Sequence, residues 1–178
     1  MHDVPTIDTE RLALRGHRLV DFDDCAALWA DPMVTRYIGG KPFSREEVWG
    51  RFLRNIGHWT ALEFGYWVVH ERGSGHFVGE VGFADFKRHV EPSLDGAPEI
   101  GWVITPSAHG RGFATEAVRA IVAWGDVRFG PVRTACLIDT ENLASIHVAE
   151  KCGYSLATRG TYRGAPTLIY ERQINASE

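Results

Sequence analysis

The sequence has few cysteines and no long hydrophobic run, and both shortages exclude classes of protein. Only 3 of its 178 residues are cysteines (Cys25, Cys136 and Cys152), and no two of them form a C-x-x-C pair. This odd, widely spaced set predicts small buried thiols in a reducing compartment rather than a disulfide framework or a zinc site. No apolar run approaches the ~20 residues of a membrane helix, and the first ten residues lack a secretory signal. We therefore expect a cytoplasmic protein that uses neither a membrane nor a metal.

A surplus of positive charge is also missing. The net charge is −4, which disfavours nucleic acid as a direct partner. Aromatic residues make up 11% of the chain, too many for a chain that stays unfolded. A length of 178 residues predicts a single domain over residues 1–178 with a core of its own. The sequence leaves open whether this domain is a monomer or a homodimer.

Hydrophobic periodicity and turn residues predict about seven strands and about four helices in one mixed α/β domain. Ser44 and Glu47 form the S-x-x-E pattern of a capping box at the start of a helix, and Asp21 is expected to cap the helix before it. The polar, turn-rich residues 87–98 are expected to form a loop. The expected strands are residues 10–15, 64–70, 76–86, 99–104, 132–139, 154–163 and 166–172. The expected helices are residues 22–30, a helix that begins after Ser44, and helices within 109–129 and 141–153.

The segment EIGWVITPSAHGRGFATE, residues 99–116, carries the clearest chemical signal. Gly110 and Gly112 flank Arg111 between an expected strand and the longest expected helix. Glycines at such a turn let backbone N–H groups approach a ligand, and the helix N-terminus adds partial positive charge. This arrangement predicts a site for a phosphate or pyrophosphate.

Three phosphate-binding patterns are distinguishable here. The Walker pattern G-x-x-x-x-G-K-[ST] is absent, and the dinucleotide pattern G-x-G-x-x-G fails because Thr115 stands at its third glycine. The pattern Q/R-x-x-G-x-G/A fits His109, Gly112 and Ala114, with a conservative departure at His109.

Several segments together resemble one known family. The segments TERLALR, DPMVTRYIGG, GEVGF, EIGWVITPSAHGRGFATEA and ENLASIHVAEKCGY occur in the order and spacing of the GNAT superfamily of N-acetyltransferases. The likeness is strongest to the RimJ/RimL-like branch, which acetylates the N-termini of ribosomal proteins, and it spans residues 9–172. It implies the GNAT fold, in which a largely antiparallel sheet splays open between the two strands that flank the long helix.

The resemblance also implies acetyl-CoA as acyl donor and an amine as acceptor, either a peptide N-terminus or a small molecule. The pantetheine arm would lie in the splayed gap and the pyrophosphate at the turn, with Arg111 beside the outer phosphates. Asn142 would bind the pantetheine or thioester region, and Ser145 would lie near the sulfur. The implied donor-binding residues are Trp102, Val103, Ile104, His109, Gly110, Arg111, Gly112, Phe113, Ala114, Thr115, Asn142 and Ser145.

Acyl transfer to an amine requires a base, which acts directly or through a water molecule, because a protonated amine has no lone pair. Glu99 is the first candidate, since it is the only carboxylate in the strand EIGWVI, and Glu80 on the neighbouring strand is the second. Relatives often place a tyrosine, as the acid for the leaving thiolate, where this chain has Ala149. Either Ser145 relays that proton or the thiolate leaves into solvent without an acid.

Two rivals remain open. A non-catalytic acyl-CoA-binding sensor would keep the glycine turn but lack working acid–base groups, and Ala149 is the one residue that hints at it. A nicotinamide-dependent oxidoreductase is disfavoured by the glycine spacing.

Overall fold

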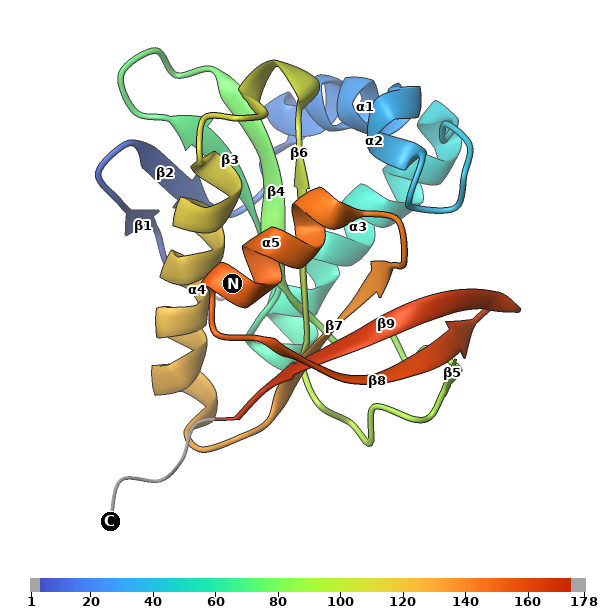
Figure 1. Cartoon of the computed structure of the whole chain (residues 1–178). Helices are drawn as coiled ribbons and strands as arrows, with labels where there is room; N and C mark the ends of the chain where they lie inside the picture. The colour runs from blue at the N-terminus through green and yellow to red at the C-terminus, as the bar shows by residue number, and fades with distance from the viewer. Residues whose placement is uncertain (1–3, 174–178) are drawn as a thin grey trace.

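The computed structural model describes residues 4–173, which form one mixed sheet with helices on both faces (Figure 1). The helices are α1 (Phe22–Ala30), α2 (Pro32–Thr35), α3 (Arg45–Leu62), α4 (Phe113–Phe129) and α5 (Leu143–Lys151), with short 3-10 helices η1 (Leu19–Asp21) and η2 (Pro106–Ala108). The strands are β1 (Ile7–Asp8), β2 (Leu12–Arg15), β3 (Tyr66–Glu71), β4 (Phe77–Ala84), β5 (Val90–Glu91), β6 (Glu99–Ile104), β7 (Thr134–Asp139), β8 (Ser155–Tyr162) and β9 (Ala165–Arg172).

The strands form a nine-stranded sheet in the order β1-β2-β3-β4-β6-β7-β9-β8-β5. Neighbouring strands are antiparallel except β6 and β7, which are parallel and connected through α4. The expected mixed, largely antiparallel sheet is therefore confirmed.

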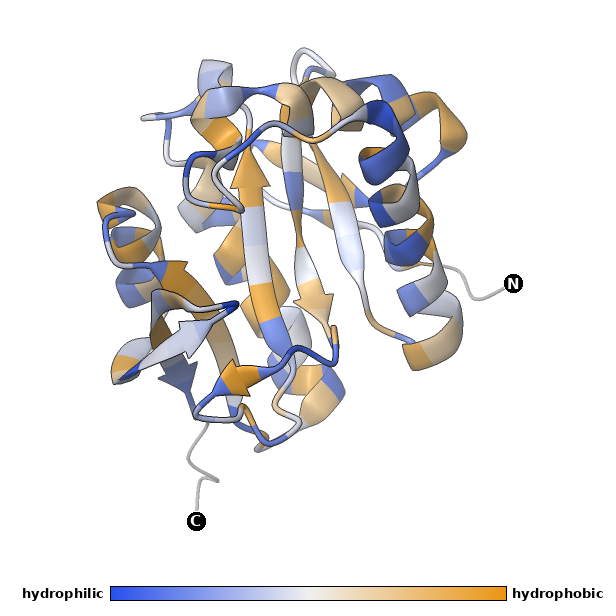
Figure 2. Ribbon diagram, turned by 90° about the vertical axis from the view of Figure 1, so that its right-hand side faces the viewer, coloured by the Kyte–Doolittle hydropathy of each residue, from blue (hydrophilic) through white to orange (hydrophobic). Residues whose placement is uncertain are grey.

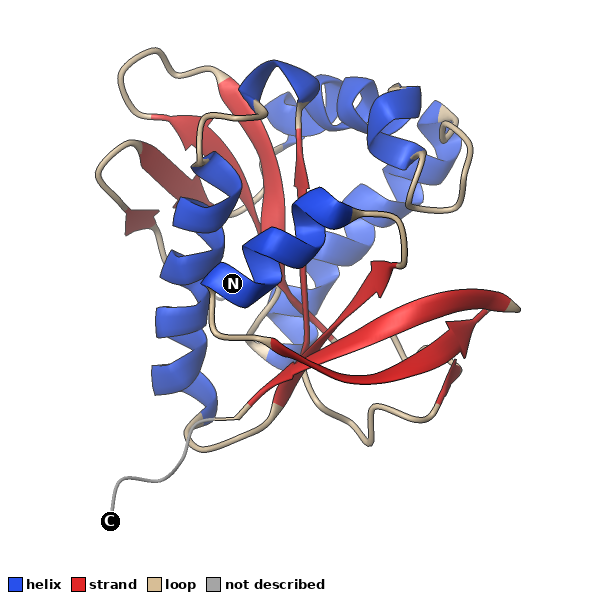
Figure 3. Cartoon of the chain, in the orientation of Figure 1, coloured by secondary structure: helices blue, strands red, loops and turns tan. Residues whose placement is uncertain are grey.

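The helices divide the core into two parts (Figure 3). Helices α4 and α5 pack on one face with buried residues such as Phe113, Val118 and Ile121, against strand residues such as Trp67 and Ile100. Helices α1, α2 and α3 cover the other face around a second, smaller cluster of apolar side chains. Figure 2 shows hydrophobic stretches along the strands and mixed hydropathy along the helices, as expected for amphipathic helices that bury one side.

The longer elements agree with the sequence predictions, and the additional ones are short. The seven longer strands and helices α1, α3, α4 and α5 match the expected set. The structure adds the two-residue strands β1 and β5 and the single-turn helix α2. The expectation of a loop over residues 87–98 is wrong at Val90 and Glu91, because these residues pair with Tyr162 and Thr161 of β8.

The predicted helix caps have different outcomes. At α3 the capping box is confirmed: Glu47 N–H donates to Ser44 Oγ (3.2 Å) and Ser44 N–H to Glu47 Oε2 (2.7 Å). Asp21 does not cap α1 with its side chain, because both of its carboxylate oxygens accept from Arg15 at 2.6 and 2.7 Å. Asp31 instead caps α2, accepting from Met33 N–H.

Two further expectations concern the thiols and the membrane. Cys25, Cys136 and Cys152 are all free and buried, as predicted. Within residues 4–173, no helix combines the length and the apolar character needed to cross a bilayer.

Candidate active site

Strands β6 and β7 diverge from a single point of contact. Among the described residues, the one rung between them joins Glu99 and Ala135, while β7 pairs with β9 over its whole length from Thr134 to Asp139. At this rung Ala135 N–H donates to the carbonyl oxygen of Pro98, and from Gly101 to Ile104 the edge of β6 that faces β7 has no strand partner. This is the splay that the resemblance implies.

The antiparallel ladder determines which backbone groups lie on the free edge of β6. Thr105 N–H donates to Val78 C=O, and Val103 lies opposite Glu80 two residues further along the ladder. Because hydrogen-bonded pairs alternate in such a ladder, the backbone groups of Val103 point toward β4. Those of Trp102 and Ile104 point toward the gap. They are therefore the ones that can pair with an extended ligand.

The turn between β6 and α4 presents free backbone donors. Gly110 (φ 74°) and Gly112 (φ 78°) adopt left-handed conformations, and Gly112 is the N-cap of α4. From Gly110 to Thr115, no backbone N–H donates to another of the described residues. The His109 ring, through Nε2, is 3.0 Å from the carbonyl oxygen of Ile104 and ties the turn to the end of β6. Free N–H groups at the N-terminus of a 17-residue helix fit an anion.

Two arginines brace this turn from outside. Arg11 donates to the backbone carbonyl of Arg111 (2.8 Å) and forms an ion pair with Glu116 of α4 (2.6 Å). The Arg111 guanidinium forms an ion pair with Glu71 of β3 and lies 4.3 Å from the ring centre of Phe113. Its side chain remains about half exposed. To contact a phosphate, Arg111 would therefore exchange one anionic partner for another.

An open cavity of about 760 Å³ adjoins the turn. Its walls include Gly112, Thr115 and Arg119 of the α4 region and Lys151 at the end of α5. The walls also include Arg11 and the acidic residues Glu10 and Glu116. Neither Arg119 nor Lys151 was predicted from the sequence. Spacings of three and four residues place Gly112, Thr115 and Arg119 on one face of a helix, so Arg119 had a detectable signal. Lys151 reaches the cavity only through tertiary packing.

Asn142 and Ser145 lie at the start of α5. Asn142 is the N-cap, and its Oδ1 accepts from Ser145 N–H at 3.1 Å. The hydroxyl group of Ser145 is half-buried and has no partner among residues 4–173. Ala149, one turn further on, is fully buried. The serine hydroxyl is thus the group that this helix end leaves free.

Glu99 lies at the closed end of the gap between β6 and β7. It is buried (7% exposed), and the Nε atom of Arg88 lies 2.9 Å from its Oε2 in an ion pair. Burial raises the pKa of Glu99, and the Arg88 guanidinium opposes the shift. A carboxylate with a raised pKa and one cationic partner suits general-base catalysis.

Glu80 occupies a different environment on β4. Its Oε1 lies 2.6 Å from His17 Nε2 and accepts from Asn55 Nδ2 (3.1 Å), while its Oε2 accepts from Trp29 Nε1 (2.6 Å). Burial acts to raise the pKa of Glu80, but the donors from His17 and Trp29 outweigh it and the pKa is lowered. The partners come from α1, α3 and the segment after β2, so this carboxylate holds three parts of the chain on the sheet.

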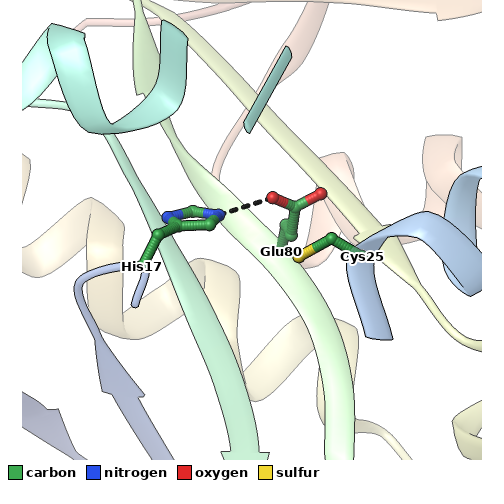
Figure 4. Close-up of side chains that lie close together, drawn as sticks. All are labelled: His17, Cys25 and Glu80. Atoms are coloured by element: carbon green, nitrogen blue, oxygen red, sulfur yellow. Dashed lines mark hydrogen bonds and ion pairs between the residues drawn. The ribbon is translucent and has the colours of Figure 1, made fainter. Parts of the chain in front are cut away.

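Figure 4 shows His17 and Cys25 beside Glu80. One nitrogen, one sulfur and one carboxylate oxygen of the three residues lie within 4.8 Å of one another, and these are atom types that bind transition metals. Both carboxylate oxygens already accept hydrogen bonds, and burial raises the pKa of the Cys25 thiol. The group therefore fits a hydrogen-bonded network, and the expectation that the protein uses no metal stays a prediction.

Comparisons with known proteins agree with this geometry. A family model described as an acetyltransferase (GNAT) domain matches residues 11–155. YkkB of Bacillus subtilis is 31% identical over 173 residues, covering 93% of this chain and 94% of YkkB. An acetyltransferase structure from Agrobacterium tumefaciens has a TM-score of 0.84 at 26% identity, covering 98% of this chain and 97% of that one. RimL, a ribosomal L7/L12 α-N-protein acetyltransferase solved with coenzyme A, has a TM-score of 0.78 at 17% identity, covering 97% and 100%; this last likeness shows the fold alone.

The chain therefore belongs to the GNAT acetyltransferases, and its family is that of the RimJ/RimL type. It is an N-acetyltransferase that uses acetyl-CoA as acyl donor, which confirms the resemblance seen in the sequence and disfavours the nicotinamide-dependent alternative.

The network around Glu80 yields a stability prediction. We expect Glu80→Gln to lower the free energy of unfolding by about 1–3 kcal/mol, because the new amide group would face the donors of Trp29 and Asn55. Denaturant unfolding measures this, with the exposed Glu91→Gln as a control that leaves stability unchanged. Unchanged stability together with a lost kcat would instead assign Glu80 to catalysis.

Proposed function

We propose that this enzyme transfers the acetyl group of acetyl-CoA directly to a primary amine, with Glu99 as the base. The observation that carries the proposal is the continuity between the free N–H groups of residues 110–115 and the unpaired edge of β6. The pyrophosphate would accept from those N–H groups. The pantetheine arm would add to β6 as an extra strand, through the backbone of Trp102 and Ile104. Arg11, Arg119 and Lys151 outnumber Glu10 and Glu116 in the walls of the adjoining cavity, and Glu116 is paired with Arg11, which supports the phosphate-rich end of CoA as its occupant.

The transfer needs no covalent enzyme intermediate. A neutral amine attacks the thioester carbonyl carbon, Glu99 accepts the proton that the amine loses, and the C–S bond breaks to give an amide and a thiolate. The free-edge N–H of Trp102 or Ile104 would stabilise the oxyanion. The Ser145 hydroxyl is the group proposed to relay a proton to the thiolate. Glu80 is the weaker candidate for the base, because its oxygens are already hydrogen-bonded.

A thiol-release assay with a panel of primary amines tests the proposal against the non-catalytic sensor. We expect release with at least one amine, and a loss of kcat in Glu99→Gln of at least about 100-fold, the lower range of general-base contributions. Affinity for CoA should be unchanged in this variant. CoA binding without thiol release from any amine would favour the sensor.

The glycine turn yields a prediction about donor binding. We expect Gly112→Ala to weaken CoA binding by tenfold or more, because the new methyl group stands among the N–H groups proposed to hold the pyrophosphate. Gly164→Ala is the matched control, since Gly164 in the β8–β9 turn has the same φ of 78°. Both variants carry the same backbone strain, of roughly 1–2 kcal/mol. Equal CoA affinity of the two variants, measured by calorimetry, would contradict the assignment of the turn.

The environment of Glu99 yields a pH prediction. Because burial raises the pKa of Glu99 and only its ionised form accepts a proton, the acidic limb of kcat/KM should lie above 4.5, the ordinary pKa of a glutamate. Arg88→Gln removes the cation that opposes this shift, so the limb should move to still higher pH. Arg128→Gln, which breaks an exposed ion pair with Glu63, is the control. A limb at the same pH in all three proteins would remove Glu99 from the role of base.

A further inference from the structure

Three arginine side chains gather on the face of the sheet that α3 covers. Arg51 and Arg54 are three residues apart on α3 and so project from neighbouring positions of the helix. Arg88 comes from the segment between β4 and β5. The guanidinium carbons of Arg54 and Arg88 lie 4.7 and 4.5 Å from the ring centre of Phe86, so these two groups share one aromatic neighbour.

Two of these three charges lack an anionic partner. Within residues 4–173, neither Arg51 nor Arg54 forms a hydrogen bond or an ion pair; their close contacts are aromatic rings. Arg51 lies 3.9 Å from the ring centre of Trp29. Burial lowers the pKa of Arg51 to about 10, and the charge of Arg54 adds to the effect.

The nearby acids are already engaged. Glu80 accepts hydrogen bonds from His17, Trp29 and Asn55, and Glu99 is paired with Arg88. Arg51 is half-buried, and a partly desolvated cation without a counter-ion is unfavourable unless an anion completes it; Arg54 is exposed, so its guanidinium is accessible to the same anion. Among the described residues Arg51 and Arg54 therefore lack a carboxylate partner, and their guanidinium groups are suited to bind an anion from outside the protein.

The cluster of Arg51, Arg54 and Arg88 lies beside the proposed catalytic base. Arg88 contacts Glu99 directly, so the cluster borders the proposed base. The hydroxyl end of Tyr66 reaches the same part of β6, since a Cβ at Gly101 would lie 2.1 Å from it. An acceptor whose amine lies at Glu99 would thus have its neighbouring groups among guanidinium and hydroxyl donors.

We propose that Arg51 and Arg54 bind a carboxylate of the acceptor, so that the enzyme acetylates primary amines that carry a carboxylate near the amine. The inference rests on the proposed function and narrows its substrate class. Guanidinium groups pair with carboxylates through two parallel hydrogen bonds, which fixes the orientation of the acceptor as well as its charge. Polycationic amines such as aminoglycosides and polyamines are disfavoured, because like charges meet at this face.

Matched acceptors test the charge preference. The C-terminally amidated dipeptides aspartyl-alanine and asparaginyl-alanine, used in this amidated form throughout, differ in that only the first carries a carboxylate; free aspartate carries its carboxylates on a small molecule, and spermidine is a polycation. We expect kcat/KM for aspartyl-alanine to exceed that for asparaginyl-alanine about tenfold or more. Comparison of aspartyl-alanine with free aspartate distinguishes a peptide from a small-molecule source of the carboxylate. Spermidine should be the poorest acceptor.

Variants connect this preference to the two arginines. We expect Arg51→Gln and Arg54→Gln each to raise the KM for aspartyl-alanine about tenfold. The KM for acetyl-CoA and the rate with asparaginyl-alanine should stay unchanged, which a merely structural role of the arginines would not produce. Arg54 is exposed, so its replacement leaves the core intact. Arg45→Gln on the same helix is the control, because Arg45 pairs with Asp23 in an exposed ion pair.

The outcomes distinguish a failure of this inference from a failure of the proposed acetyl transfer. Transfer to all acceptors without a charge preference, or a preference for spermidine, overturns the inference and leaves the transferase intact. If no acceptor releases thiol, calorimetric binding of aspartyl-alanine to the CoA complex decides. Binding that both variants weaken supports the anion site while the proposed transfer fails, and absence of binding overturns the inference.

Discussion

The site depends on the divergence of β6 from β7 beyond the rung between Glu99 and Ala135. Strand β7 pairs with β9 along its whole length, so beyond this rung one edge of β6 has no strand partner, although the His109 ring contacts its Ile104 carbonyl. Unpaired backbone groups are unfavourable and invite an extended partner. The free stretch begins beside a buried carboxylate and ends at the glycine turn, and β6 is roughly 17 Å long at ~3.3 Å per residue. A long, amide-bearing donor with a phosphate at one end fits this geometry.

Two buried glutamates on adjacent strands show how environment separates similar groups. Glu80 accepts from three donors and its pKa is lowered, whereas Glu99 has one cationic partner and its pKa is raised by burial. Carboxyl groups whose environments shift their pKa values apart commonly have different tasks. Here Glu80 joins α1 and α3 to the sheet, and by fixing α3 it also fixes Arg51 and Arg54. The hydrogen bonds that make Glu80 the weaker candidate for the base thereby also fix the helix that carries the proposed acceptor-binding arginines.

The sequence predicted what is encoded locally. Periodicity and caps located the longer strands and helices, and the spacing of Gly110 and Gly112 located the turn that carries the free N–H groups. The short elements β1, β5 and α2 were missed, because two to four residues provide no period to detect. Arg51 and Arg54 were also missed, since arginines on an amphipathic helix normally face solvent. Only the fold brings Phe86 and Arg88 beside them, as it brings Trp29 to Glu80 across 51 positions of the chain.

Side chains alternate between the two faces of β6, and the proposed sites for acetyl-CoA and for the amine lie on different sides of this strand. The side chains of Glu99 and Val103 face the helices α1 and α3, and Gly101 lies between them on the same face, whereas Ile100 and Ile104 pack in the core beneath α4. The proposed donor lies along the edge between β6 and β7, and the arginines lie on the α3 face. The missing side chain at Gly101 lets the Tyr66 hydroxyl come close to β6 from that face. An amine bound on that face would reach the edge of the strand without crossing the α4 core, and Glu99 is the residue of β6 where the proposed donor and acceptor sites would meet.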